Sequence, residues 1–424
     1  MIKGVTTFIH ILNTILYKIL LGGDRCMLSY NYLLDLALIL LSTKALGIIT
    51  KKFKMPKVVG ALLAGLVFGP AVLNILKETN FIIQLAELGV ILLMFSAGME
   101  TDLTELKKTG KASFIIAIFG VLIPLIGGFL VAYLFSDLEV VKDSTTNILL
   151  QNIFIGVILT ATSVSITVET LKEMGKLNTC AGTAILGAAI IDDILGIVSL
   201  TIISSMTKPS VNVWFVLLKI VVYFIFVIGV GVVVYKLFDI WMKYENRDKR
   251  RFITASLVFC LLLSYISEEI FGVADITGAF IAGLILSNVH RKEYVASRLD
   301  VVSYSLLSQV FFASIGLKVV IDNMSIGMVF FVITLTIVAV LTKIIGSGIG
   351  AKICKLSNRE CIQIGTGMVS RGEVALIVAS KGAQLGVLSN IMLAPIVIVV
   401  VVSTIISPIL LNLSFRDKEG LKCK

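Results

Sequence analysis

Residues that commonly build catalytic and metal sites are scarce in this 424-residue chain. It has two histidines, too few and too peripheral to suggest a metal site, and six cysteines that form no CxxC pair. Scattered cysteines without neighbouring histidines indicate incidental or buried thiols rather than metal ligands or a disulfide framework. The sequence also lacks a nucleophile motif at an accessible position and a phosphate-cradling loop. We therefore predict neither an enzyme nor a bound cofactor.

Charge is scarce as well: 15% of the residues are charged and 57% are hydrophobic, and the mean hydropathy is +1.02. Soluble domains do not tolerate this composition. The apolar runs are about 17–28 residues long, enough to cross a hydrocarbon core of about 30 Å as helices. We predict an all-α polytopic membrane protein, embedded in the lipid bilayer, with about thirteen spans at residues 33–49, 56–74, 82–98, 112–135, 149–171, 180–205, 212–237, 250–267, 272–289, 299–317, 325–351, 361–381 and 388–413.

The net charge of +10 could indicate a nucleic-acid partner. No basic run is interleaved with aromatic residues on a soluble module, so we predict no nucleic acid. Lysines and arginines instead favour alternate loops by about three to one, the asymmetry of the positive-inside rule. Together with an odd number of spans, this predicts a cell (plasma) membrane protein whose N-terminus is outside and whose C-terminus is cytoplasmic.

Two short segments repeat one another: GALLAGL at residues 60–66 and GAFIAGL at residues 278–284. Both carry small residues at the spacing that lets membrane helices approach closely. They lie in the second and ninth predicted spans, so the two copies run in opposite directions. Such inverted repeats are a recurring construction of secondary transporters.

This repeat sets the predicted domain boundaries. Residues 1–30 are interpreted as an N-terminal extension, either an interfacial amphipathic helix or a segment that precedes a true start at Met27. The remaining units are a first inverted repeat of six helices with an acidic pair at residues 31–206, a linker helix and basic loop at 207–249, a second inverted repeat at 250–413 and a cytoplasmic tail at 414–424.

Each half is expected to hold one interrupted helix near the membrane midplane. In the fifth span, the stretch TATSVS concentrates hydroxyl side chains that compete with the backbone for hydrogen bonds. In the twelfth span, the stretch GTGMVSRGE combines glycines with charge. We predict two broken, crossing helices, interrupted around Thr160, Thr162, Ser163 and Ser165 in the first half and around Ser370, Arg371, Gly372 and Glu373 in the second.

Ionisable residues inside the membrane are costly and usually functional. Asp192 and Asp193 lie mid-span in the sixth run, and Lys343 is the one cation deep in the eleventh. Neighbours on a helix point about 100° apart, so one acid can face a cavity while the other faces a partner. Lys343 needs a counter-ion, and an acid of the facing half is the obvious one. Because desolvation and repulsion raise the proton affinity of paired carboxylates while a cation lowers it, we predict that a proton and a monovalent cation compete for this pair.

Five stretches carry a specific likeness to known proteins: KVVGALLAGLVFGP, TATSVSITVETLKEMGKLNT, AILGAAIIDDILGIV, LTKIIGSGIGAK and MVSRGEVALIVASKG. Through them the chain resembles the monovalent cation:proton antiporter superfamily, in particular the bacterial sodium:proton antiporters of its second family. The resemblance extends over essentially residues 30–413.

The resemblance implies roles for individual residues. Asp193 looks like the cation and proton carrier, and Asp192 looks like the acid that pairs with Lys343. The broken helices then contribute Thr160 and Ser163 from the first and Ser370, Arg371 and Glu373 from the second. The resemblance also implies a homodimer, elevator-like movement of a core domain against a dimerisation domain, and electrogenic exchange.

We therefore predict a secondary active antiporter that exchanges cytoplasmic Na⁺ or Li⁺ for external protons and so serves pH homeostasis. The alternative is K⁺/proton antiport, or the membrane subunit of a potassium-efflux system, whose regulatory domain this chain lacks. Two interpretations from other classes are a cation channel and a sensor. Inverted repeats do not provide the rotational symmetry of a channel filter, and the sequence offers no output domain.

Overall fold

The computed structural model describes residues 31–53, 55–136, 148–207, 213–244, 250–289, 292–319, 325–389 and 392–416. The predicted extension at residues 1–30 lies outside the described residues, as does the tail beyond residue 416. The chain divides into two compact units, Met1–Ala37 and Leu38–Lys424, and the architecture below is that of the second.

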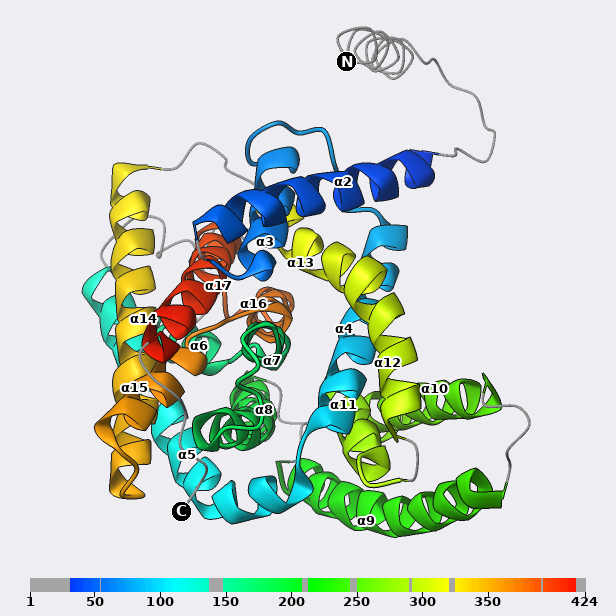
Figure 1. Cartoon of the computed structure of the whole chain (residues 1–424). Coiled ribbons are helices and arrows are strands. Elements are labelled where there is room, and N and C mark those ends of the chain that lie inside the picture. The colour runs from blue at the N-terminus through cyan, green and yellow to red at the C-terminus, as the bar shows by residue number, and fades with distance from the viewer. Residues whose placement is uncertain are drawn as a thin grey trace, which may run out of the picture. The chain divides into compact units, whose positions relative to one another are not determined.

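Every regular element of the described residues is a helix, and two short segments, η1 and η2, are π-helical. Figure 1 shows the elements in chain order. They are α2 (Asn31–Lys52), α3 (Lys57–Phe68), α4 (Asn80–Glu100), α5 (Leu103–Leu134), α6 (Ile148–Thr160), α7 (Val164–Glu173), α8 (Cys180–Thr207), α9 (Val213–Tyr244), α10 (Arg250–Tyr265), η1 (Ile266–Phe271), α11 (Asp275–Leu286), α12 (Lys292–Val302), η2 (Ser303–Leu307), α13 (Ser308–Leu317), α14 (Ile326–Ile353), α15 (Asn358–Gly367), α16 (Glu373–Gln384) and α17 (Leu393–Phe415).

The prediction of an all-α polytopic membrane protein is confirmed. Within the described residues, 10 helices are long and apolar enough to cross a membrane, and three shorter apolar helices accompany them. Two of the predicted spans are helical over shorter stretches, α3 and α11, since Gly69 ends the first and the turn at Gly272, with a φ of 69°, precedes the second. The number of thirteen spans stays a prediction.

Helix α5 begins at Leu103, well before the apolar run that predicted it. The Asp102 carboxylate caps this end by accepting hydrogen bonds from the backbone N–H groups of Thr104, at 2.8 Å, and Glu105. These bonds favour the ionised carboxylate and hold the pKa of Asp102 below its ordinary value. The polar residues after Asp102 are therefore helical although they are not part of an apolar run.

The helices pack into two groups. We call α5, α6, α7, α8, α14, α15, α16 and α17 the core group, because each packs against other members of this set. We call α3, α4, α10, α11, α12 and α13 the flanking group. In Figure 1, α14 runs beside α5 in the first group, and α4 runs beside α11 in the second. Contacts between the groups are made by α7 with α3 and α4, and by α17 with α3.

The two GA-x-x-AGL segments make corresponding contacts. In α3 the segment packs against α13, where a β-carbon on Gly316 would lie 2.5 Å from the carbonyl oxygen of Leu62. In α11 the segment packs against α4, where a β-carbon on Gly283 would lie 2.8 Å from the amide nitrogen of Met99. Close backbone approach of this kind requires glycine, and it is the main way in which membrane helices gain packing energy.

Candidate ion-binding site

Two helices of the core group are interrupted, and the interruptions pack against each other. The first lies at residues 161–163, between α6 and α7, and the second at residues 368–372, between α15 and α16. The Ser163 N–H donates to the carbonyl oxygen of Ser370 at 2.8 Å, and the Ser370 hydroxyl donates to the carbonyl oxygen of Ser163 at 2.8 Å. These reciprocal bonds satisfy backbone groups that a continuous helix would have satisfied internally, as a membrane interior requires.

Two neighbouring residues strengthen this crossing. The Thr167 hydroxyl, on α7, donates to the carbonyl oxygen of Gly367 at 2.7 Å and lies 2.7 Å from the Ser370 hydroxyl. A β-carbon on Gly372 would lie 2.6 Å from the Ser163 hydroxyl oxygen, so a larger residue would push the segments apart. The crossing therefore depends on the small size of Gly372 as well as on hydroxyl groups.

Arg371 is fully buried at this crossing. Its guanidinium donates to the carbonyl oxygens of Leu159, at 2.9 and 3.2 Å, and of Ala339, at 2.8 Å. Leu159 lies in the last turn of α6, where carbonyl groups have no partner within the helix. Arg371 thus supplies donors and a positive charge at the C-terminal end of a half-helix, where both are stabilising. Its hydrogen bonds therefore connect the second interruption, where Arg371 lies, to α6 and α14.

Asp192 and Lys343 form an ion pair inside the core group. The Lys343 Nζ atom lies 3.2 Å from Asp192 Oδ1 and 3.3 Å from Oδ2. Lys343 is 0% exposed and Asp192 2% exposed, so water does not screen the pair. Gly120 of α5 lies next to the pair, where a β-carbon would be 2.8 Å from the Ser347 hydroxyl oxygen, so this glycine allows α5 and α14 to pack closely here. The Thr162 hydroxyl approaches the Asp192 carboxylate without a hydrogen bond of standard geometry.

Asp193 follows on α8 and is buried too, with 6% of its surface exposed. Because adjacent residues point about 100° apart on a helix, its carboxylate leaves the helix in another direction from that of Asp192. The ion pair of Lys343 is made with Asp192. The two adjacent acids therefore have different surroundings, because the Lys343 ammonium pairs with Asp192 and the Asp193 carboxylate leaves α8 in another direction.

The other residues expected at the site differ in whether their side chains face the crossing or bond within their own segment. The Thr160 hydroxyl is turned back onto its own helix, where it donates to the carbonyl oxygen of Val157 at 2.7 Å. The Ser163 hydroxyl lies 3.1 Å from that of Ser165. Glu373 is the first residue of α16, and its side chain lies outside the described part of the structure. The structure thus brings the two interruptions together, while the hydroxyl of Thr160 is engaged locally.

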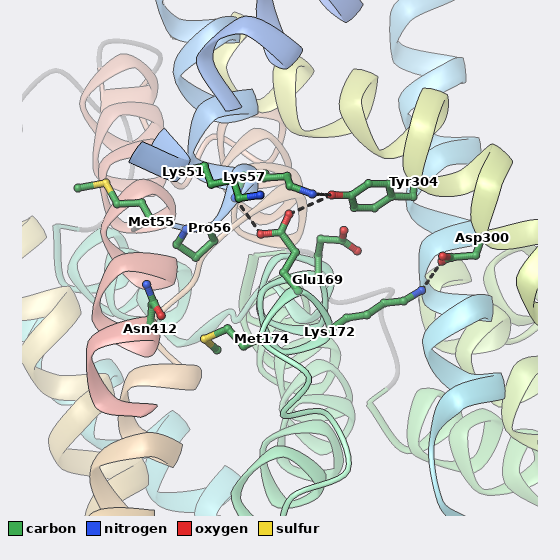
Figure 2. Close-up of a pocket in the computed structure, with 11 residues that line it drawn as sticks. Lys51, Met55, Pro56, Lys57, Glu169, Lys172, Met174, Asp300, Tyr304 and Asn412 are labelled. Carbon is green, nitrogen blue, oxygen red and sulfur yellow. Dashed lines mark hydrogen bonds and ion pairs between the residues drawn. The ribbon is translucent and has the colours of Figure 1, made fainter. Parts of the chain in front are cut away.

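Two cavities lie between the core and flanking groups. We call the first the lysine-end cavity: it has a volume of about 530 Å³, is lined by Lys51, Lys57 and Lys172, and is shown in Figure 2. We call the second the opposite-end cavity. It measures about 540 Å³, and its wall includes the first turns of α4 together with Gly196 and Ile197, which follow Asp193 by one turn. The other end of α4 lies beside the lysine-end cavity, because Glu100 in its last turn pairs with Lys172 at 3.0 Å. We call this end of the molecule the lysine end.

Sequence reasoning missed the polar residues of the lysine-end cavity and the partners of Arg371. A signal for the cavity was present in the stretch VETLKE, where Glu169, Lys172 and Glu173 recur at helical spacing and so share one face of α7. No comparable signal marked Thr167 or Thr404, although the Thr404 hydroxyl donates to the carbonyl oxygen of Arg371.

Residues 37–413 match a family model that is described as "sodium/hydrogen exchanger, transmembrane". This match covers both interruptions, the acidic pair and Lys343. The chain belongs to the sodium/hydrogen exchanger family. As the family is one of transporters, the prediction that the chain is not an enzyme is confirmed, and so is the predicted superfamily.

Curated members of the exchanger family match nearly the whole chain. The Na⁺/H⁺-K⁺ antiporter GerN of Bacillus cereus is 38% identical over 92% of this chain and 98% of its own length. A Na⁺/H⁺ antiporter of Enterococcus hirae is 38% identical over 89% of this chain and 96% of its own. The solved structure of the sodium proton antiporter MjNhaP1 from Methanocaldococcus jannaschii superposes with a TM-score of 0.67, at 20% identity, over 92% of this chain and 95% of that one. At this identity, the structural match supports the fold alone.

Proposed function

We propose that this exchanger is a secondary active antiporter that moves Na⁺ or Li⁺ out of the cytoplasm in exchange for external protons. The observation that carries the proposal is the buried pair of Asp192 and Lys343 directly beside a second buried acid, Asp193. Relatives with 38% identity are named as Na⁺/H⁺ antiporters, which is the activity that this geometry supports.

Competition for Asp193 provides the exchange chemistry. A carboxylate in a poorly hydrated site binds either a proton or a small cation, because each neutralises the same charge. Carboxylate, hydroxyl and carbonyl oxygens are the hard ligands that alkali cations prefer. Hydroxyl and carbonyl groups of the crossing, including those of Thr162 and Ser163, are the proposed further ligands. Asp193 is therefore proposed as the carrier that is occupied by a cation in one direction and by a proton in the other.

Lys343 is proposed to make the exchange electrogenic. Its ammonium neutralises Asp192 in the structure. A cation that enters this site would repel the ammonium and favour the release of its proton. The proton lost by Lys343 would add to the one that Asp193 exchanges, so more protons than cations would move in each cycle.

Alternating access is proposed to arise from movement of the core group against the flanking group. Two cavities between the groups, at opposite ends of α4, support this proposal because each offers water and ions a route from one side. The corresponding contacts of α3 with α13 and of α11 with α4 support two inverted repeats with the predicted boundaries. We also propose a homodimer, and an orientation with the lysine-rich end in the cytoplasm.

K⁺ is the second candidate ion. GerN of Bacillus cereus is named as a Na⁺/H⁺-K⁺ antiporter and matches nearly this whole chain. Na⁺ and K⁺ use the same oxygen ligands, so the residue types at the site accommodate either ion.

Reconstitution in liposomes with an internal pH dye tests the proposal. With an imposed proton gradient, we expect the gradient to collapse when Na⁺ or Li⁺ is added, and a separate addition of K⁺ tests the second ion. The variant Asp193→Asn should abolish this response, because an amide does not exchange a proton. Glu105→Gln serves as a control, because Glu105 is a partly exposed residue in the first turn of α5 and pairs with Lys108 of the same helix at 2.8 Å. Normal exchange by Asp193→Asn would refute the carrier role, and uphill cation movement driven by protons would exclude a channel.

A further inference from the structure

The lysine-end cavity contains an acid for which neither the ion-binding site nor the packing accounts. Glu169 lies on α7 and is only 3% exposed, yet it lines this cavity, as Figure 2 shows. Among the described residues, no hydrogen bond or ion pair reaches its carboxylate. An ionised carboxylate buried to this degree is strongly destabilising unless it has a partner. In the conformation of this structure, burial therefore favours the protonated, neutral form of the Glu169 carboxyl group.

The ammonium group of Lys172, three residues after Glu169 on α7, is already paired with other residues. The Lys172 ammonium pairs with Glu100 at 3.0 Å, pairs with Asp300, and donates to the Ser96 hydroxyl at 3.0 Å. Three acceptors therefore use the three protons of this ammonium. An ionised Glu169 would have to draw Lys172 away from Glu100 or Asp300.

The Glu173 carboxylate also has hydrogen-bond partners in the flanking helices. It accepts from the backbone N–H of Lys57, at 2.8 Å, and from the Tyr304 hydroxyl, at 3.4 Å. The Lys57 ammonium in turn donates to the Tyr304 hydroxyl at 2.7 Å. Lys57 is the first residue of α3, so the carboxylate of Glu173 occupies a helix N-terminus, where negative charge is favoured.

These bonds join the two helix groups. Lys172 and Glu173 lie on α7 of the core group. Their partners lie on α3, α4 and α12 of the flanking group and on η2, which connects α12 to α13. Glu169 precedes Glu173 by four residues and thus occupies the same face of α7, where two like charges repel. The titratable groups that face Glu169 or line its cavity are Lys51 of α2, Lys57 of α3, Glu100 of α4, Lys172 and Glu173 of α7, Asp300 of α12 and Tyr304 of η2.

We propose that Glu169 is a second proton-binding residue, separate from Asp193, whose proton keeps the core and flanking groups joined at the lysine end. Loss of this proton places a negative charge beside Glu173 and in competition for Lys172. The bonds of Lys172 and Glu173 to the flanking group then weaken, and the core group is released. The control of transport by this proton rests on the proposed antiport.

The expected consequence is a pH profile that depends on Glu169. In the wild type, Na⁺-driven proton exchange should rise as the pH at the lysine end rises and Glu169 loses its proton. Glu169→Gln cannot ionise, so it should keep the groups joined and transport about fivefold more slowly than the wild type at alkaline pH. Glu169→Asp retains a titratable group and should keep a rising profile.

The test is Na⁺-driven exchange by the reconstituted full chain, measured from about pH 6 to about pH 9. Glu105→Gln is the matched control, since it removes a carboxylate at the start of α5 without touching the cavity. A profile of Glu169→Gln that superposes on the wild type would overturn the control of transport by Glu169. A flattened profile in Glu169→Gln with a rising one in Glu169→Asp would support it.

Infrared difference spectroscopy on the purified protein provides a readout that does not need transport. Proton loss from a buried carboxyl group removes its C=O stretching band, and this band should be present in the wild type at neutral pH and missing in Glu169→Gln. Identical spectra of the two proteins would overturn the proton-binding role. If the wild type exchanged no cation at all, the antiport proposal would fail, and the spectra would still decide whether Glu169 holds a proton.

Discussion

Replacing Lys343 with methionine removes the ammonium from the buried acidic pair and keeps a side chain of similar length. Asp192 is 2% exposed and loses the cation that lies 3.2 Å away. Removing one partner of a buried ion pair typically costs about 3–5 kcal/mol, because the other charge stays buried without compensation. For a chain of this size, that corresponds to a fall of roughly 3–6 °C in the apparent melting temperature.

The double variant Lys343→Met with Asp192→Asn separates the ion pair from general packing. With both charges gone, most of the lost stability should return, because replacing a whole buried pair is often nearly neutral. Lowering the pH should also reduce the defect of the single variant, since a proton can then neutralise Asp192 in place of the ammonium.

The assay is thermal unfolding of purified protein in one detergent at one scan rate, because unfolding of such proteins is commonly irreversible. Lys236→Met is the control, since Lys236 also lies in an apolar helix, α9, but is exposed. We expect it to change the melting temperature little. If the double variant melted as low as Lys343→Met, the two residues would not be energetically coupled, and the electrostatic account of this site would be refuted.

Two further substitutions test the packing around the site. Arg371→Lys retains the positive charge but loses the fork that bonds the carbonyl oxygen of Leu159 twice, so it should cost about 2–3 kcal/mol, measured as a lower melting temperature; an unchanged value would contradict the role of Arg371 at the end of α6. Gly316→Ala places a β-carbon 2.5 Å from the Leu62 carbonyl oxygen and should cost about 1–3 kcal/mol through overpacking. Gly229→Ala, which meets no atom within 4 Å, should not destabilise the protein, and equal losses in the two variants would contradict the close-contact explanation.

Local sequence signals predicted the membrane helices and the interruptions. The apolar runs are long enough to identify spans without knowledge of their neighbours, because the bilayer imposes a length on each one. The TATSVS and GTGMVSRGE stretches predicted breaks for a similar reason, since hydroxyl side chains and glycines weaken a helix wherever they occur. The structure places breaks at residues 161–163 and 368–372, within those stretches.

Helix ends were less predictable where polar residues determine them. The start of α5 was missed because the cap at Asp102 makes a polar segment helical without adding any apolar residue. The shortness of α3 and α11 was missed because apolar residues continue beyond the helices into the neighbouring turns.

The sequence by itself determined that this chain lies in a membrane, that two of its helices are broken, and that Asp192, Asp193 and Lys343 need compensation for burial. These conclusions depend on residue types and spacings within single helices. The resemblance implied that Asp192 pairs with Lys343, and the tertiary structure shows this pair as a contact between α8 and α14. Only the tertiary structure decided that Arg371 completes the end of α6 and that Glu169 lies in one cavity with Lys172. Asp192 and Lys343 are 151 residues apart, and no local pattern specifies which distant charge a buried group will meet. That choice follows from how the helices pack, because a low-dielectric interior stabilises a charge only through the groups that packing brings within a few ångströms of it.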